Sequence, residues 1–200
     1  MIVWGSSRPG RNGGVVADWV KRHAQEDKRL EVDFVDLQEL TLPFFDEPLS
    51  PFAMADLDDY KNPAGRAWAE RVAKAEGVLI ITPEYNHGAP AVLKNALDWV
   101  GREWMDKPVA FVSYGSTAGG ARAVEQLRST TIELGLIQVA NPIHFFFYRQ
   151  AFNEQGEPNH ASTNDSLTKM FDELIRLHDI FCIAKQHNQN AGQCALVDQP

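Results

Sequence analysis

Gly77 to Val100 reads GVLIITPEYNHGAPAVLKNALDWV, and this stretch decides the fold. Its first part, Val78 to Thr82, is an almost continuous apolar run, which is typical of a strand buried on both faces of a parallel sheet. After Pro90, apolar residues recur at helical spacing and predict an amphipathic helix with the proline in its first turn. A buried strand followed by such a helix indicates an α/β protein.

The loop between this strand and helix reads Pro83-Glu84-Tyr85-Asn86-His87-Gly88. In open α/β sheets, ligands bind at the carboxyl ends of the strands, so this loop is the first candidate for function. Glu84 and His87 could serve as acid–base groups, but each lacks an evident partner, and an isolated loop histidine is more often a surface residue. The loop fits better as a border for a planar heterocycle.

Strands and helices alternate along the rest of the chain, which predicts a parallel sheet with helices on both faces. Five strands favour a flavodoxin-like three-layer sandwich of order 2-1-3-4-5, whose ligand site lies where the strand order reverses. The loops after strands 1, 3 and 4 then meet at one edge. The other four predicted strands cover residues 2–4, 30–37, 108–114 and 137–147, the last interrupted at Pro142.

Composition narrows the class of protein. The chain has 200 residues, 44% of them hydrophobic, and a formal net charge of 19 − 27 = −8, which argues against a nucleic-acid or anionic-membrane partner. Cys182 and Cys194 lack the spacing of a zinc site or a disulfide framework, so no metal is expected. No apolar run could span a bilayer and no signal peptide is evident, so we expect a cytoplasmic location.

The loop from Ser6 to Gly14 precedes a predicted helix, where backbone N–H groups and the helix dipole favour an anion. Two serines and two arginines add donors that suit a phosphate. The loop is neither a Walker loop nor G-x-G-x-x-G, and it lacks a cysteine for phosphatase chemistry. The alternative is an ordinary strand–helix turn with solvated arginines.

A second glycine-rich loop, Gly115 to Gly120, follows the fourth strand. Glycine has no side chain and tolerates unusual backbone angles, so this loop could approach a ligand closely. A tight turn into the next helix is the alternative.

Four segments, in this order, resemble the NAD(P)H-dependent FMN reductase family of flavodoxin-like quinone, chromate and azo reductases. The first loop is similar to its G-S-x-R phosphate loop, and the loop after strand 3 to its P-E-Y-N motif. The resemblance covers most of residues 1–181. The segments are Gly5-Ser6-Ser7-Arg8-Pro9-Gly10-Arg11, Leu42-Pro43-Phe44-Phe45-Asp46-Glu47-Pro48, Pro83-Glu84-Tyr85-Asn86 with Leu93 to Trp99, and Ser113-Tyr114-Gly115 with Gly119-Gly120-Ala121-Arg122.

The resemblance implies an FMN-binding domain over residues 1–184, followed by a polar tail over 185–200 that we expect to be disordered or to lie on a neighbour. Arg11 stands where many members have a small hydroxyl residue. The run Phe145 to Tyr148 is unusually aromatic, which could alter the second-substrate pocket or a subunit contact. The expected cofactor contacts are Ser6, Arg8, Arg11, Asn12 and Gly13 for the phosphate; Pro83, Glu84, Tyr85 and Asn86 for the ring and ribityl chain; and Gly115, Ser116, Gly119 and Gly120 for the other side.

The implied activity is transfer of hydride from NADPH or NADH to a quinone, free flavin or similar acceptor in a ping-pong cycle, without catalytic side chains, because the chemistry belongs to the flavin. A flavodoxin-type electron carrier or a redox-sensing flavin-binding protein, either without nicotinamide turnover, is the alternative, and a flavin-free interaction protein is a third hypothesis. Family members are usually dimers or tetramers. We expect a homodimer, with Trp99, Trp104 and the helix from Pro90 to Gly101 contributing to the interface; plain core packing is the alternative.

Overall fold

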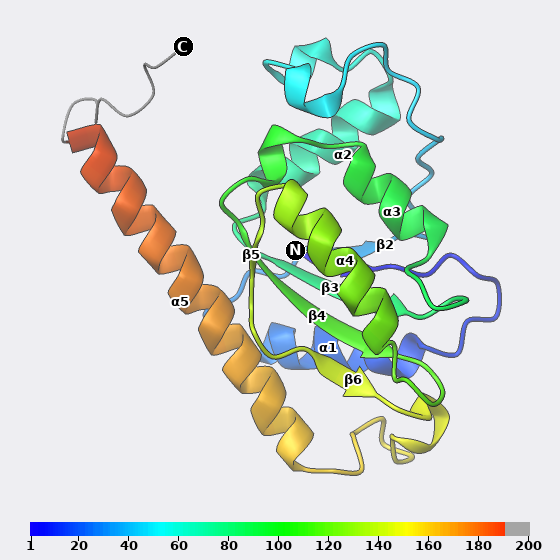
Figure 1. The fold of residues 1–200 in the computed structure, drawn as a ribbon. Helices are drawn as coiled ribbons and strands as arrows, with labels where there is room; N and C mark the ends of the chain where they lie inside the picture. The colour runs from blue at the N-terminus through cyan, green and yellow to red at the C-terminus, as the bar shows by residue number, and fades with distance from the viewer. Residues whose placement is uncertain (191–200) are drawn as a thin grey trace.

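A six-stranded parallel sheet forms the middle layer of the protein in the computed structural model, which describes residues 1–190 (Figure 1). The strand order β2-β1-β3-β4-β5 confirms the prediction, and β6 also pairs with β4. The longest strands, β3 and β4, are buried along their whole length. The strands are β1 (Ile2–Trp4), β2 (Phe34–Asp36), β3 (Val78–Pro83), β4 (Pro108–Tyr114), β5 (Ile137–Gln138) and β6 (Ile143–Phe145).

The fifth strand position is divided in two, as the sequence predicted. β5 pairs with the start of β4 at Pro108, and β6 pairs with its end at Tyr114. The intervening residues 139–142 include Pro142, which has no N–H to donate to a ladder. β2 is shorter than the predicted strand over 30–37, because only Phe34 to Asp36 pair with β1.

Helices cover both faces of the sheet (Figure 1). Alternate side chains of β3 serve the two cores, as a pleated strand requires: Ile80 packs beneath the layer of α2 and α4, and Ile81 beneath α1 and α5. The helices are α1 (Gly14–Glu26), α2 (Pro63–Lys74), α3 (Ala91–Asp98), α4 (Ala121–Glu133) and α5 (Ser162–Asn190), with short 3-10 turns η1 (Pro51–Ala53), η2 (Leu57–Asp59), η3 (Arg102–Trp104) and η4 (Tyr148–Gln150).

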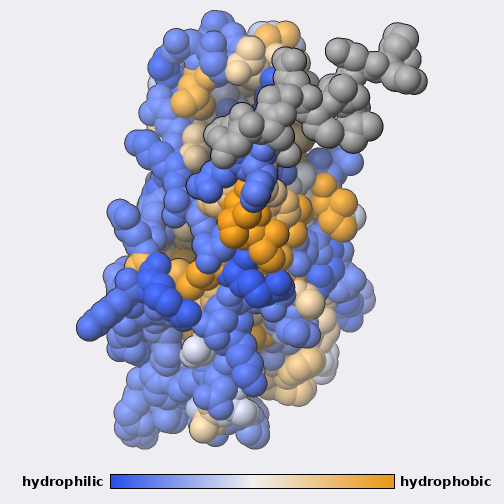
Figure 2. Space-filling model, turned by 90° about the vertical axis from the view of Figure 1, so that its left-hand side faces the viewer, coloured by the Kyte–Doolittle hydropathy of each residue, from blue (hydrophilic) through white to orange (hydrophobic). Residues whose placement is uncertain are grey.

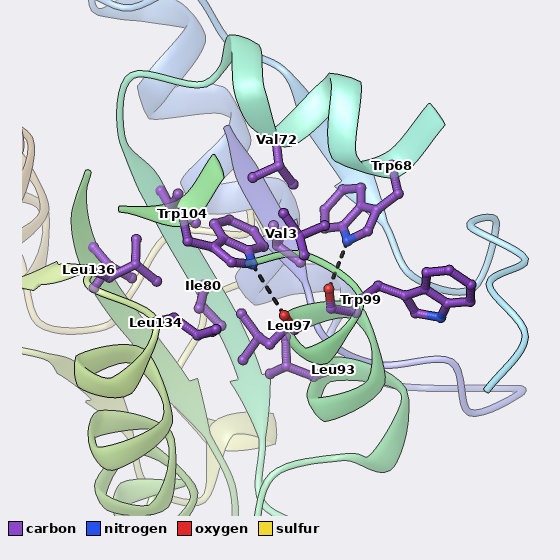
Figure 3. Close-up of a cluster of buried hydrophobic side chains, with 14 of the residues drawn as sticks. Val3, Trp68, Val72, Ile80, Leu93, Leu97, Trp99, Trp104, Leu134 and Leu136 are labelled. Atoms are coloured by element: carbon purple, nitrogen blue, oxygen red, sulfur yellow. Dashed lines mark hydrogen bonds between the residues drawn. The ribbon is translucent and has the colours of Figure 1, made fainter. Parts of the chain in front are cut away.

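The expectation that the Trp99 and Trp104 side chains contribute to a subunit interface is wrong, whereas the part assigned to the helix from Pro90 to Gly101 stays a prediction. Their exposed fractions are 0% and 1%, and both lie in the core beneath α2 (Figure 3). Each buried indole N–H also has an acceptor, as a buried tryptophan requires. Trp99 donates to the Pro43 carbonyl at 2.7 Å, and Trp104 donates to the Leu97 carbonyl at 3.2 Å. Core packing, the alternative, therefore explains both residues.

The final helix is longer than its apolar periodicity over 167–181 indicated. α5 runs from Ser162 to Asn190, so it continues into residues 185–190, which were expected to belong to the polar tail. Residues 191–200 of that predicted tail lie outside the described part of the chain. Figure 2 faces the α5 side, where hydrophilic surface surrounds an exposed hydrophobic patch. Across residues 1–190, no helix combines the length and apolar character needed to cross a bilayer.

Candidate functional site

The loops after β1, β3 and β4 enclose a cleft of about 170 Å³ at the carboxyl edge of the sheet. This is the edge where the sequence placed a ligand site, and most of the predicted contact residues line it. Those residues are Arg8, Arg11, Asn12, Gly13, Pro83, Glu84, Tyr85, Gly115 and Ser116; Tyr114, Tyr148 and Arg149 complete the wall.

The first loop ends at α1 in a way that leaves the start of the helix open to an anion. No side chain caps α1, and its first turn holds no acidic residue. The first N–H groups of a helix have no partner within the helix, so they are available to a phosphate. Gly13 is required here because a Cβ would lie 2.2 Å from the Tyr114 ring. Arg8 and Asn12 are exposed beside this helix start.

Ser6 is buried and does not line the cleft, although it was predicted to hold the phosphate. Its hydroxyl lies 2.9 Å from the Tyr85 hydroxyl, so it joins the first loop to the loop after β3. Arg11 lines the cleft, but its guanidinium is already engaged. It pairs with Asp36, and one of its nitrogens lies 2.7 Å from Asp36 Oδ1. It also donates to the Ser6 carbonyl.

The loop after β3 is a tight two-residue turn. The Tyr85 N–H donates to the Gly88 carbonyl at 2.9 Å, and the Gly88 N–H donates back at 3.0 Å. The two central residues, Asn86 and His87, have φ of 50° and 69°, the left-handed values that such hairpin turns need. Both side chains are exposed and neither lines the cleft, so the structure does not bring Asn86 to the other predicted contacts.

Glu84 holds this turn against the start of α4. Its side chain is only 7% exposed, and its carboxylate accepts from Arg122 Nε at 2.6 Å and from the Arg122 backbone N–H at 3.2 Å. A carboxylate at the first turn of a helix also interacts favourably with the helix dipole. Glu84 therefore fixes the relative position of two loops of the cleft.

Gly119 and Gly120 shape the third loop and do not line the cleft, where we had expected cofactor contacts. Both have positive φ, 58° and 86°, and a Cβ on Gly120 would lie 2.6 Å from Ser113 Cβ. The Ser113 hydroxyl donates to the Gly119 carbonyl at 2.8 Å and holds the loop in this form. Gly115 and Ser116 are the residues of this loop that reach the cleft.

One wall of the cleft, which was not among the predicted cofactor contacts, comes from the aromatic run after β6. Phe147 N–H donates to the Ser116 carbonyl at 2.9 Å, and Tyr148 N–H donates to Gly115 at 3.3 Å. These bonds extend the pairing of β6 with β4 and bring Tyr148 and Arg149 to the cleft. The unusual aromatic content of the run was the only sequence signal for this wall. The position of the run beside the cleft depends on how β6 pairs with β4.

Tyr114 is a buried residue that lines the cleft. Its hydroxyl accepts a hydrogen bond from Trp4 Nε1 at 3.1 Å, and burial raises the pKa of this phenol to about 12. The phenol is therefore neutral at physiological pH. Its ring packs against Gly13 of the first loop, so Tyr114 joins that loop to the end of β4.

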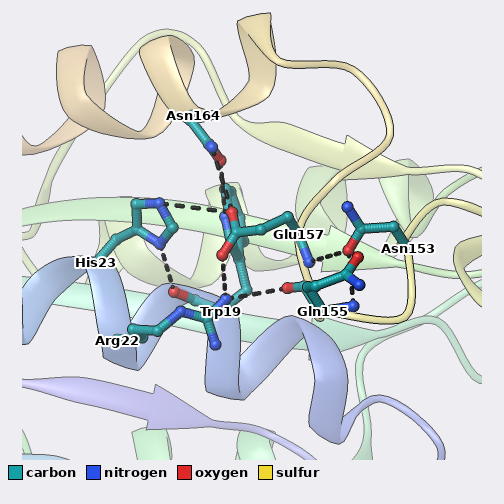
Figure 4. Close-up of polar contacts among 8 residues, drawn as sticks. Trp19, Arg22, His23, Asn153, Gln155, Glu157 and Asn164 are labelled. Carbon is teal, nitrogen blue, oxygen red and sulfur yellow. Dashed lines mark hydrogen bonds and ion pairs between the residues drawn. The ribbon is translucent and has the colours of Figure 1, made fainter.

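Polar contacts behind the cleft tie α1 to the chain that follows η4 (Figure 4). Trp19 Nε1 donates to Asn164 Oδ1 at 2.9 Å, Arg22 pairs with Glu157, and His23 Nε2 lies 3.8 Å from the same carboxylate. These bonds attach the segment after η4 to α1, the helix whose start lies at the cleft.

A larger groove, of about 680 Å³, lies between the segment around β6 and the first half of α5. It includes His144, whose Nδ1 lies 2.6 Å from Ser113 Oγ and whose pKa is lowered by burial. No loop from β1 or β3 reaches this groove. Within residues 1–190, no group of three or more His, Cys, Asp or Glu side chains is placed to hold a metal ion.

The fold and the site together define a flavodoxin-like α/β protein whose three-loop cleft lies beside the uncapped start of α1. A solved structure of FerB, a flavoenzyme NAD(P)H:(acceptor) oxidoreductase from Paracoccus denitrificans, has a TM-score of 0.68 to this chain at 24% identity, covering 89% of this chain and 95% of the other. An oxidised flavodoxin from Bacillus cereus has a TM-score of 0.51 at 14% identity, covering 88% and 95%. Both comparisons show the fold.

Sequence comparison identifies the family. The model of the NADPH-dependent FMN reductase family matches residues 1–148, so the chain belongs to that family. An NAD(P)H-dependent FMN reductase of Schizosaccharomyces pombe is 38% identical over 120 residues, which are 60% of this chain and 59% of that protein. One of Saccharomyces cerevisiae is 37% identical over 134 residues, 64% of this chain and 70% of the relative. The match thus spans about three fifths of the length of the first relative.

Proposed function

We propose that this protein is an FMN-dependent oxidoreductase that takes hydride from NADPH or NADH and reduces a quinone or similar acceptor in a ping-pong cycle. The observation that carries the proposal is the convergence of three loops on one cleft beside the open start of α1. Family membership supports the same activity. So does a 29% identical relative described as an NADPH:quinone oxidoreductase of Arabidopsis thaliana.

The residues of the cleft fit FMN in their chemistry. The N–H groups at the start of α1, with Arg8 and Asn12, would bind its phosphate, and no carboxylate in the first turn opposes that charge. Pro83, Tyr85, Gly115 and Ser116 would border the ribityl chain and ring. When bound, the flavin supplies the hydride chemistry, while the protein orients it and excludes water.

A reconstitution experiment tests this function. The purified chain is stripped of ligand, titrated with FMN, and mixed with NADPH or NADH under anaerobic conditions while flavin absorbance is recorded. Loss of the oxidised flavin spectrum, followed by its return on adding a benzoquinone, is the expected result. A protein that binds FMN but leaves it oxidised would instead be the electron carrier, and a protein that binds no FMN would contradict the proposal.

A homodimer, or a tetramer, remains part of the proposal, although Trp99 and Trp104 have no role in it because both are buried. Light scattering at micromolar concentration measures the assembly, and a monomer would contradict it. The cytoplasmic location also stays a prediction, which fractionation of cells expressing the tagged protein tests.

A further inference from the structure

We propose that Arg11 is a positioning residue that holds the phosphate loop through Asp36, and that Arg8 supplies the side-chain positive charge for the phosphate. This inference rests on the proposed function, since it concerns the same cleft. It departs from the family-based expectation, in which Arg11 itself contacts the phosphate.

We call the pair of Arg11 and Asp36 the clamp. Its geometry depends on the register of two neighbouring strands. Trp4 ends β1 and Asp36 ends β2, and the parallel ladder places the two residues side by side. The guanidinium of Arg11 lies over the Trp4 ring, with Cζ 3.6 Å from its centroid. Stacking on an aromatic face together with a two-point pair to a carboxylate is a geometry that only arginine provides.

Three bonds then fix the loop. The Arg11 guanidinium pairs with both Asp36 oxygens and donates to the Ser6 carbonyl. Asp36 is itself held, because its Oδ1 accepts from the Gln38 backbone N–H at 2.9 Å. The start of the loop at Ser6 and its later part at Arg11 are therefore both tied to the end of β2.

Burial makes this pair different from an exposed ion pair. The Arg11 and Asp36 side chains are only 11% and 15% exposed, so water screens them little. The carboxylate neutralises the guanidinium, which leaves Arg11 with little net charge to offer a phosphate. Removing either partner would leave a poorly compensated charge within the loop.

Arg8 has the opposite environment. Its side chain is exposed at the rim of the cleft, and within residues 1–190 none of its atoms joins an ion pair or side-chain hydrogen bond. A free guanidinium beside the open start of α1 is suited to binding a phosphate at two points. The two arginines of the loop therefore have separate tasks.

The test compares FMN with riboflavin, which lacks the phosphate, by fluorescence titration of the ligand-free protein. The ratio of the two dissociation constants measures the phosphate contribution. For Asp36→Asn and Arg11→Met alike, we expect the preference for FMN to fall about tenfold, and Arg11→Lys does not restore it. Arg8→Gln also lowers the preference, and the double variant of Arg11 and Asp36 loses no more than Asp36→Asn alone.

If Arg11 contacted the phosphate directly, the Asp36→Asn variant would show the opposite change in FMN preference. Asp36→Asn would then release Arg11 and leave the FMN preference unchanged or increased, which would overturn the proposal. Asp33→Asn is the matched control, because Asp33 pairs with Arg71 next to the other end of β2. That variant should alter thermal stability without altering the ratio.

A second measurement needs no flavin, so it separates this inference from the proposed function. In the ligand-free protein, Asp36→Asn should speed deuterium uptake over residues 6–13, whereas Asp33→Asn should not. Unchanged uptake in Asp36→Asn contradicts the clamp. Failure of the wild-type protein to bind FMN contradicts the proposed function and leaves this exchange result to decide the clamp.

Discussion

The cleft at the carboxyl edge and the groove beside α5 share one wall, the segment 145–150, but are built differently. The groove is the larger, at about 680 Å³ against about 170 Å³. The cleft receives residues from the loops after three strands, whereas one strand, its following turn and one helix form most of the groove. Convergence of several loops, more than volume, marks the candidate site, which agrees with the general position of ligands in open α/β sheets.

Filling each cavity with a side chain gives the sharpest contrast. Gly13→Val places a Cβ 2.2 Å from the Tyr114 ring, so this side chain, which lines the cleft, must shift. We expect FMN affinity to fall about 100-fold, with roughly 1–3 kcal/mol of overpacking strain. Ser166→Leu, in the groove, should leave FMN affinity within about twofold. Fluorescence titration measures both, and the opposite ranking would move the flavin site to the groove.

A second comparison, with a smaller expected effect, neutralises one carboxylate in each cavity. Glu84→Gln weakens the charged bonds to Arg122 that join two loops of the cleft, and we expect about tenfold weaker FMN binding. Glu173→Gln is the matched change in the groove, where the carboxylate pairs with Arg176 on the surface. Equal affinities for these two variants would show that Glu84 does not position the site.

One titratable residue in each cavity should make the folding stability depend on pH, Tyr114 at high pH and His144 at low pH. Burial raises the pKa of Tyr114 to about 12, so the unfolded chain loses this proton first and stability falls as pH rises from about 10 to 12. Burial lowers the pKa of His144, so the unfolded chain gains a proton first and stability falls as pH drops below about 6.5.

Spectroscopic titration checks both directions. Absorbance at the phenolate band should show two tyrosines that ionise late, because burial also raises the pKa of Tyr60, and only one of them should remain in Tyr114→Phe. NMR of the histidine ring protons should show one resonance with a lowered pKa that is absent in His144→Gln. Ordinary titration of either residue would mean that its cavity is more hydrated than the structure indicates.

The smallest effect concerns the turn at the rim of the cleft. His87 has φ of 69°, which strains a residue with a Cβ, so His87→Gly should raise the free energy of unfolding by about 0.5 kcal/mol after the entropic cost of glycine. Because its side chain is exposed and away from the cleft lining, NADPH oxidation should stay within about twofold. Urea denaturation and steady-state rates measure the two quantities, and a large loss of turnover would make His87 a catalyst.

Sequence patterns predicted the sheet order, the break near Pro142 and the three loops, because each rests on local periodicity or on the residue types of a turn. The missing wall at Tyr148 and Arg149 depends on backbone bonds to Gly115 and Ser116, which no local pattern encodes. The partner of Arg11 was hidden for the same reason. Asp36 is 25 residues away, and only the β1–β2 register brings it beside the loop.

The tryptophans show a different limit. The aromatic residues near the site suggested more aromatic surface than one core face needs. Trp99 and Trp104 nevertheless both donate to carbonyl groups within the same chain. Composition reveals that large side chains must be buried, but whether a core or a partner covers them depends on packing. Gly65 completes that core, since a Cβ there would lie 2.1 Å from the Trp99 ring.

The interruption of the fifth strand also bears on how the protein behaves when concentrated. A long, flat edge strand offers unpaired N–H and C=O groups to the sheets of other molecules and promotes aggregation. Here the outer edge consists of two residues of β5 and three of β6, separated by a stretch that contains Pro142. Replacing Pro142 with a strand-forming residue would lengthen the edge that offers unpaired N–H and C=O groups. The proline therefore favours colloidal stability.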